Sequence, residues 1–267
     1  MAELDSSEMH RRGFVSALGA FPAFALRGRV GDVLERIIAC TEVAAEADRE
    51  KWAEARRDAV NAIMSIVRTL GVSKEQGETS IGSSTLVRLY ECFIAGLGDY
   101  TMDRRGDIGA WVREACMVAL HDATALVMAS ADGPALADDL SVCVRRFVPL
   151  IAQQAVEKID RTRGLAAKLF ADLVFHQPPV PGIPAREKVL QNKSLRKFHI
   201  FDFINGVLPC SQIPPSPFRW WPSFLRRPGE THFCGSRRTR PFLSSRKCFF
   251  STITGTDNAA TAQAINL

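Results

Sequence analysis

The fold class is decided by one stretch of the sequence, Asp107-Ile-Gly-Ala-Trp-Val-Arg-Glu-Ala-Cys-Met-Val-Ala-Leu-His-Asp-Ala-Thr-Ala-Leu-Val127. On a helical wheel, the polar side chains Arg113, Glu114, His121 and Thr124 share one side with Met117. Apolar residues fill the remaining arc, which is wider than the stripe expected for a surface helix resting on a single core. Such a helix is covered on more than one side, as happens in a stacked array where each helix packs on its hairpin partner and on the next repeat.

Helical periodicity continues on both sides of this stretch. Apolar residues recur at three- and four-residue spacing in the segments Glu8 to Phe21, Val30 to Ala47, Trp52 to Leu70, Ser84 to Leu97, Leu136 to Ile159 and Arg161 to Phe175. Gly71, the glycines between 77 and 82, and Asp132-Gly133-Pro134 fit helix ends. No convincing alternating strand appears, so we predict an all-α chain.

A weak repeat specifies the kind of array. Arg12, Arg57, Arg113 and Arg163 each precede a run of small and apolar residues, at spacings of 45, 56 and 50 residues. These spacings are close to the period of about 40–47 residues found in HEAT units. The sequence therefore predicts an α-solenoid of HEAT/armadillo-like helix pairs.

The best-defined copy of the repeat begins at Asp107. In it we expect Asp107 to cap the helix, Val112 to pack inward, Arg113 to tie neighbouring repeats together, and the small Ala115 to let helices approach.

The composition divides the chain into three parts: a helical array over residues 1–176, a proline-rich linker with a helix start over 177–192, and a tail over 193–267. Eleven of the 14 prolines follow Gln177, and the tail holds 11 Lys and Arg against 3 Asp and Glu. The rest of the chain has 23 against 26, so its net charge is −3. We expect a largely disordered tail whose attraction to RNA, acidic lipid or acidic protein segments is nonspecific, and no specific nucleic-acid binding.

No residue pattern predicts catalysis, a metal site or a cofactor. The seven cysteines lack ligand spacing and indicate a reducing compartment without disulfides. His121-Asp122 has no nucleophile at motif spacing, and Asp99, Asp103 and Asp107 do not follow a calcium-loop pattern. The uncharged stretch after Arg12 imitates a signal peptide, but acidic residues precede it and it is too short to span a bilayer. We expect a non-enzymatic, cytoplasmic chain without a membrane span.

The polar side of the Asp107 helix is the best candidate for a partner surface. We assign it Arg113, Glu114, Met117 and His121, with an ordinary solvated face as the alternative. Trp111 is expected to be a packing anchor between repeats, with a partner-binding role as its alternative.

Two blocks of sequence carry a resemblance to a known family. One is Asp99-Tyr-Thr-Met-Asp-Arg-Arg-Gly-Asp-Ile-Gly-Ala-Trp-Val-Arg-Glu-Ala-Cys-Met117, and the other is Ile151-Ala-Gln-Gln-Ala-Val-Glu-Lys-Ile-Asp160-Arg161. Both resemble the C-terminal part of the tubulin-folding cofactor D family. Asp99, Tyr100, Asp160 and Arg161 are therefore expected to be repeat-motif residues. The similarity runs from about Ser7 to Leu190, and the tail from about Asn192 has no counterpart.

The resemblance implies a function. Members of the family capture β-tubulin, act with other tubulin-folding cofactors to assemble the α/β-tubulin heterodimer, promote GTP hydrolysis by tubulin, and have an Arf-like small GTPase as a partner. It implies a cytoplasmic location, with the cytoskeleton and centrosome as further sites. Because family members are several times longer, two alternatives stay open: a generic HEAT-repeat scaffold, and a truncated isoform without function.

Overall fold

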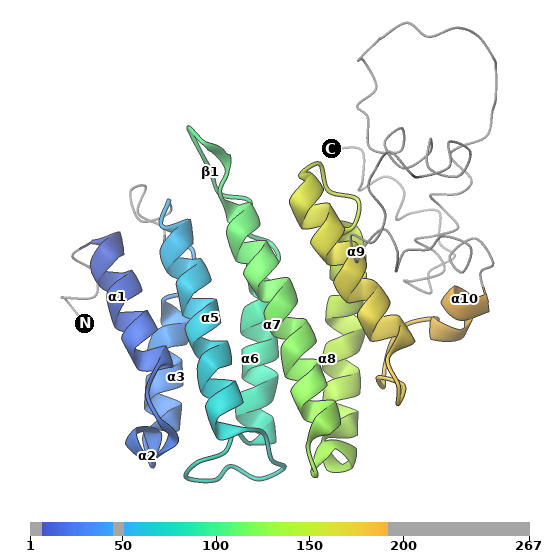
Figure 1. The fold of residues 1–267 in the computed structure, drawn as a ribbon, viewed down its shortest axis with the longest axis horizontal. Helices are drawn as coiled ribbons and strands as arrows, with labels where there is room; N and C mark the ends of the chain where they lie inside the picture. The colour runs from blue at the N-terminus through green and yellow to red at the C-terminus, as the bar shows by residue number, and fades with distance from the viewer. Residues whose placement is uncertain (1–6, 45–50, 192–267) are drawn as a thin grey trace, which may run out of the picture.

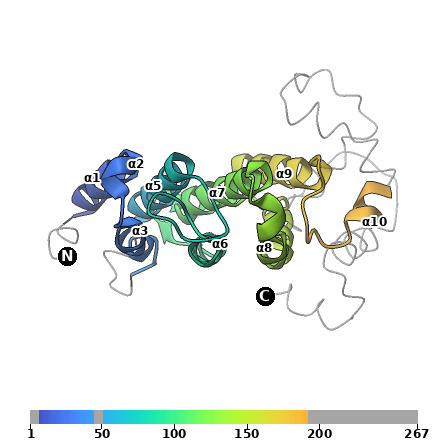
Figure 2. The same cartoon turned by 90° about the horizontal axis from the view of Figure 1, so that it is seen from below.

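The computed structural model describes residues 7–44 and 51–191, which form two layers of helices (Figures 1 and 2). The first layer consists of α1 (Glu8–Gly19), α5 (Ala53–Leu70), α7 (Gly109–Ala129) and α9 (Asp160–Phe175). The second layer consists of α3 (Val30–Ala39), α6 (Ser83–Gly96) and α8 (Gly133–Gln154). Two further helices, α2 (Ala23–Leu26) and α10 (Arg186–Gln191), are short.

Successive helices form antiparallel hairpins, so the four helices of the first layer run in the same direction (Figure 1). Each first-layer helix packs on its neighbours in the layer, in the order α1, α5, α7, α9, and α6 packs on both α7 and α8. This arrangement is an α-solenoid, and the fold-class prediction is confirmed.

The central helix α7 is covered on nearly every side. It contacts α5 and α9 within its own layer and α6 and α8 in the other. Cys116, Leu120 and Val127 are each 0% exposed, so the wide apolar arc was a correct indication of burial on several sides.

Small residues set the close approach between helices. A Cβ atom added to Gly19 of α1 would lie 2.8 Å from Cα of Ala62 in α5. A Cβ added to Gly96 of α6 would collide with the sulfur of Cys116 in α7. Contacts of this kind bring backbones close enough for interior packing without voids.

Two expected boundaries of α8 are wrong. The helix begins at Gly133 rather than Leu136, because Pro134 lies in its first turn, where a missing backbone N–H costs nothing. It ends at Gln154 rather than Ile159.

A short hairpin was also missed. Strands β1 (Met102–Asp103) and β2 (Gly106–Asp107) pair antiparallel, with Met102 opposite Asp107. A ladder of two residues per strand is too short to leave an alternating pattern in the sequence.

The proline-rich segment is packed against α8. Val180 is 3% exposed, and Gly182, with φ +81°, lies so close to Ser141 that a Cβ would sit 2.7 Å from its Cα. Nε of Arg186, the first residue of α10, donates to the carbonyl of Val174 at 2.9 Å. The predicted tail over 193–267 lies outside the described residues.

Candidate functional site: a buried polar network beneath a projecting hairpin

Two fully buried arginines lie near the start of first-layer helices. Arg56 of α5 is 1% exposed and Arg113 of α7 is 0% exposed. Arg56 donates from Nε to Oδ2 of Asp99 at 2.8 Å and from a terminal nitrogen to the hydroxyl of Thr101 at 3.0 Å. Both acceptors belong to the loop between α6 and α7, so α5 is tied to the loop that enters the next repeat.

Arg113 is held by several acceptors at once. One terminal nitrogen donates to Oδ2 of Asp107 at 2.9 Å, the other donates to the carbonyl of Asp99 at 2.7 Å, and Nε donates to Oε1 of Gln154 at 3.0 Å. Its guanidinium also lies 4.0 Å from the ring centroid of Tyr100. A buried charge is tolerated when it is paired and hydrogen-bonded in this way.

Asp99 joins the two arginines. Its carboxylate accepts from Arg56, and from the amide and hydroxyl of Thr101 at 3.0 and 2.7 Å, while its carbonyl accepts from Arg113. The loop is therefore fixed at its base to both α5 and α7.

The hairpin above this base projects beyond the ends of the helices (Figure 1). Met102 is 62% exposed and Tyr100 is 47% exposed, and both line an open pocket of about 430 Å³ together with Val43. The exposed Arg104 has no ion pair among the described residues. The neighbouring Arg105 pairs with Asp103 at 2.8 Å and with Glu54 at 3.3 Å, and lies over the ring of Trp111.

Three ionisable side chains of this region have shifted pKa values: Tyr100, Asp103 and Arg105, whose pKa is raised mainly by its hydrogen bond to Asp103. Partial burial raises the pKa of Tyr100, and the hydrogen bond from Gln154 offsets this only in part, so the phenol stays a donor and donates to Glu157 at 2.8 Å. For Asp103, partial desolvation acts to raise the pKa, but the hydrogen bonds from the amide and guanidinium of Arg105 outweigh it and the pKa is lowered. Asp103 therefore stays ionised across the neutral range.

The predicted exposed stripe of α7 is wrong for two of its members. Arg113 and Met117 are both 0% exposed. A helical wheel separates polar from apolar residues, but it cannot show that a polar side chain is turned into a buried network. These two residues cannot contact a partner in this arrangement.

The other predicted partner residues remain accessible in part. Glu114 accepts from Arg161 at 3.0 Å and from the hydroxyl of Thr162 at 2.6 Å, which links α7 to α9. A ring nitrogen of His121 lies 2.9 Å from Asp122, and Trp111 packs beneath Arg105. Their role in partner binding stays a prediction.

The structure shows the surroundings of the predicted repeat-motif residues. Asp107 precedes the N-cap residue Ile108, and its Oδ1 accepts from the amide of Ala110 at 3.1 Å in the first turn, while Val112 is 1% exposed. Ala115 packs against the core. In α9, Asp160 pairs with Arg163 in the first turn, and Arg161 reaches Glu114.

The register of the predicted repeat is wrong by one residue in three of four copies. The buried polar positions are Arg11, Arg56, Arg113 and Thr162, not Arg12, Arg57 and Arg163. Arg12 instead pairs with Asp58 and Glu54 on the neighbouring helix. The missed signal was apolar spacing, because Val15 and Val60 follow Arg11 and Arg56 by four residues and share their faces.

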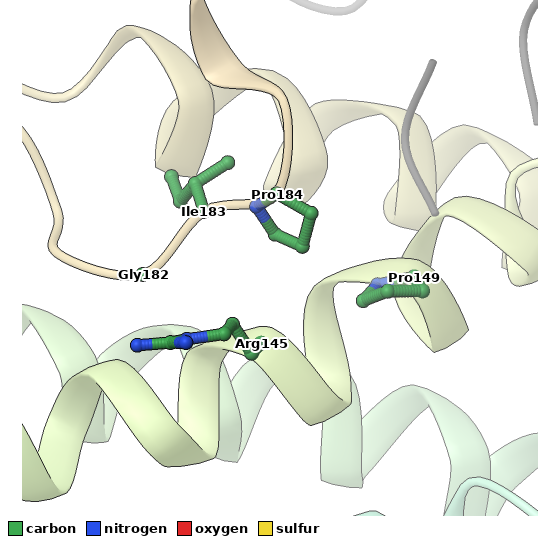
Figure 3. Close-up of a pocket in the computed structure, with 5 residues that line it drawn as sticks. All are labelled: Arg145, Pro149, Gly182, Ile183 and Pro184. Atoms are coloured by element: carbon green, nitrogen blue, oxygen red, sulfur yellow. The ribbon is translucent and has the colours of Figure 1, made fainter. Parts of the chain in front are cut away.

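The described residues hold no group of three or more His, Cys, Asp or Glu side chains placed to bind a metal ion. Within the same ranges, no helix is both long enough and apolar enough to cross a membrane. A second open pocket, of about 460 Å³, lies where the proline-rich segment meets α8 and is lined by Arg145, Pro149, Gly182, Ile183 and Pro184 (Figure 3). Its single charged side chain, Arg145, donates to Ser141 at 2.9 Å.

Comparison with known proteins gives a consistent result. Residues 145–199 match the family model for the C-terminal part of tubulin folding cofactor D. The tubulin-specific chaperone D of Dictyostelium discoideum is 26% identical over 130 residues, which cover 43% of this chain and 9% of that protein. The tubulin-folding cofactor D of Schizosaccharomyces pombe is 32% identical over 78 residues, covering 29% of this chain and 6% of that protein.

The resemblance inferred from the sequence is confirmed, and the family match reaches residue 199, slightly beyond the expected limit near Asn192. The chain spans less than a tenth of the length of these two relatives. No solved structure matches it.

Proposed function

This chain is related to the C-terminal part of the tubulin folding cofactor D proteins, and from that relationship we propose that it is a binding module of the tubulin-folding machinery. Its ligand would be β-tubulin, captured during assembly of the α/β heterodimer. The observation that supports this most directly is the match of residues 145–199 to the family model, because that segment runs through α8, α9 and α10 of the array.

The finer parts of the proposal concern partners and location. Other tubulin-folding cofactors and an Arf-like small GTPase would bind the longer proteins of which this array is a part. GTP hydrolysis would take place on tubulin, and the chain would contribute contacts rather than a reaction. We propose a cytoplasmic location, close to microtubules and the centrosome.

The projecting hairpin is the best place for the tubulin contact. Tyr100 and Met102 present exposed apolar surface, and Arg104 adds a positive charge without an ion pair among the described residues. Aromatic, methionine and arginine side chains are enriched at protein interfaces. Because Asp99 fixes the base of the hairpin, little conformational entropy would be lost when a partner binds.

A binding assay with purified α/β-tubulin tests this proposal. Met102→Asp in the full chain should weaken tubulin binding by at least about tenfold, since substitution of an interface hot spot costs about 2 kcal/mol or more. The matched control is Val142→Asp, which places the same charge on a similarly exposed apolar residue of α8, 58% exposed.

The possible results separate the alternatives. Loss of binding with Met102→Asp and not with Val142→Asp supports the hairpin as the contact. An equal effect of both variants would contradict it. No binding by the unmodified chain, with circular dichroism showing a folded helical array, would favour a truncated isoform without function.

A further inference from the structure

One face of α1 is exposed although it carries no Asp, Glu, Lys or Arg. The side of α1 that packs on α5 contains Arg11, Val15 and Gly19, all buried. The opposite side, called here the outer face, continues past the helix end into Ala20 and Phe21. Its residues are all exposed: Met9, His10, Gly13, Phe14, Ser16, Ala17, Ala20 and Phe21. Met9 is 71%, Phe14 45% and Phe21 40% exposed, so large apolar side chains lie in water along this face.

In the neighbouring helix of the first layer, α5, the face that corresponds to the outer face of α1 is covered by α1 itself. Glu54 and Asp58 of α5 pair with Arg12, and Ala62 lies against Gly19. Glu54, Asp58 and Ala62 are four residues apart and therefore lie along one stripe of α5.

The corrected repeat register transfers this stripe onto α1. Arg11 and Arg56 are 45 residues apart, so Glu54, Asp58 and Ala62 correspond to Met9, Gly13 and Ala17. In α1 and α5, an alanine (Ala17 or Ala62) follows the buried arginine by six residues. The same spacing occurs in α7, where Ala119 follows Arg113. The outer face of α1 is thus the position at which the array receives a neighbouring helix.

We propose that the outer face of α1 is a docking surface for a helix of one further helical repeat, packed alongside α1 as α1 packs alongside α5. Small residues at Gly13 and Ala17 permit close approach, and a Cβ added to Gly13 would have no atom within 4 Å in the present structure. Among the described residues, nothing therefore blocks a close approach at Gly13.

The chemistry of the face specifies the partner further. The acids Glu54 and Asp58, which bind Arg12, are replaced on α1 by Met9 and Gly13. The partner helix therefore needs an apolar residue at the position that Arg12 has in α1. It also needs a small residue to face Ala17, just as Gly19 of α1 faces Ala62 of α5. The two relatives, of which this chain covers 9% and 6%, are long enough to supply such a repeat.

The test measures binding of the full 267-residue chain to a probe taken from one relative. The probe is the Dictyostelium discoideum tubulin-specific chaperone D, cut immediately before its region of similarity to this chain. Gly13→Leu fills the outer face and should weaken binding at least about tenfold, because overpacking a close helix contact is costly. The matched control is Gly31→Leu in α3, which is also an exposed helical glycine with nothing within 4 Å of an added Cβ.

Each outcome decides the question. Binding that is lost with Gly13→Leu and kept with Gly31→Leu supports the proposal. Absence of binding by the unmodified chain, or equal loss with both variants, would overturn it. If sedimentation instead shows a dimer that Gly13→Leu abolishes, a second copy of the chain occupies the face and the proposed occupant is wrong.

This inference is independent of the tubulin contact. The hairpin and the outer face of α1 belong to different surfaces, so Gly13→Leu should leave tubulin binding unchanged. Failure of the one proposal would therefore be distinguishable from failure of the other.

Discussion

At the scale of single residues, stability depends on side chains that are both charged and buried. Arg113 has acceptors on β2, on the loop that follows α6 and on α8, and it is 0% exposed. Removing one member of such a network leaves the other buried groups without partners, which lowers the free energy of unfolding strongly. This loss is larger than the stability that the intact network adds over an apolar core of the same size.

Arg113→Ala should lower the free energy of unfolding by about 3–5 kcal/mol, because Asp107 and Gln154 would lose their buried donor. Urea unfolding followed by circular dichroism measures this. Arg104→Ala is the control, since Arg104 is exposed, and its effect should stay within about 0.5 kcal/mol. Equal effects of the two substitutions would contradict the importance of the network.

Burial also predicts how stability depends on alkaline pH. Burial raises the pKa of the Cys116 thiol and of the Tyr90 phenol above their ordinary values of 9.0 and 10.0. Above pH 9 the unfolded chain releases protons that the folded chain retains, so stability is full below that pH and falls as the pH rises. Urea unfolding at pH 8 and pH 10 should show this loss, and Cys116→Ala should reduce the difference between the two.

At the scale of helices, the same substitution should have opposite effects at two glycines. Gly96→Ala places a Cβ against the sulfur of Cys116 and should destabilise the protein by about 1–3 kcal/mol. Gly164→Ala, in α9, meets no atom within 4 Å and should stabilise it by about 0.5–1 kcal/mol, because alanine favours helix. Thermal unfolding of both variants checks the signs, and a shift in the same direction for both would refute this account of the α6–α7 contact.

The helices could be predicted from the sequence because their periodicity is local. The layers and the burial of α7 followed from the width of its apolar arc. The partner surface could not be predicted from the helical wheel of α7 alone. Arg113 and Met117 are buried by neighbouring helices, whose positions the wheel does not show. The hairpin at Met102 was missed because strands of two residues each are too short to leave an alternating pattern.

At the scale of the whole described array, protection from solvent should be graded. Because α7 contacts α5, α6, α8 and α9, its amides should exchange with deuterium more slowly than those of α1, which packs mainly on α5. Hydrogen exchange with mass spectrometry checks this. Faster exchange in α7 than in α1 would contradict the central position assigned to it.

The position of Asp99 has a consequence for how the array comes apart. Solenoids whose repeats touch only through apolar surface can fray from one end, one unit at a time. Here the side-chain carboxylate of Asp99 accepts from Arg56, and its backbone carbonyl accepts from Arg113 in the next repeat. If the two repeats separated, a buried arginine would lose its acceptor. The units on either side of Asp99 should therefore melt in one cooperative step, and the loop that presents the hairpin is also the element that couples them.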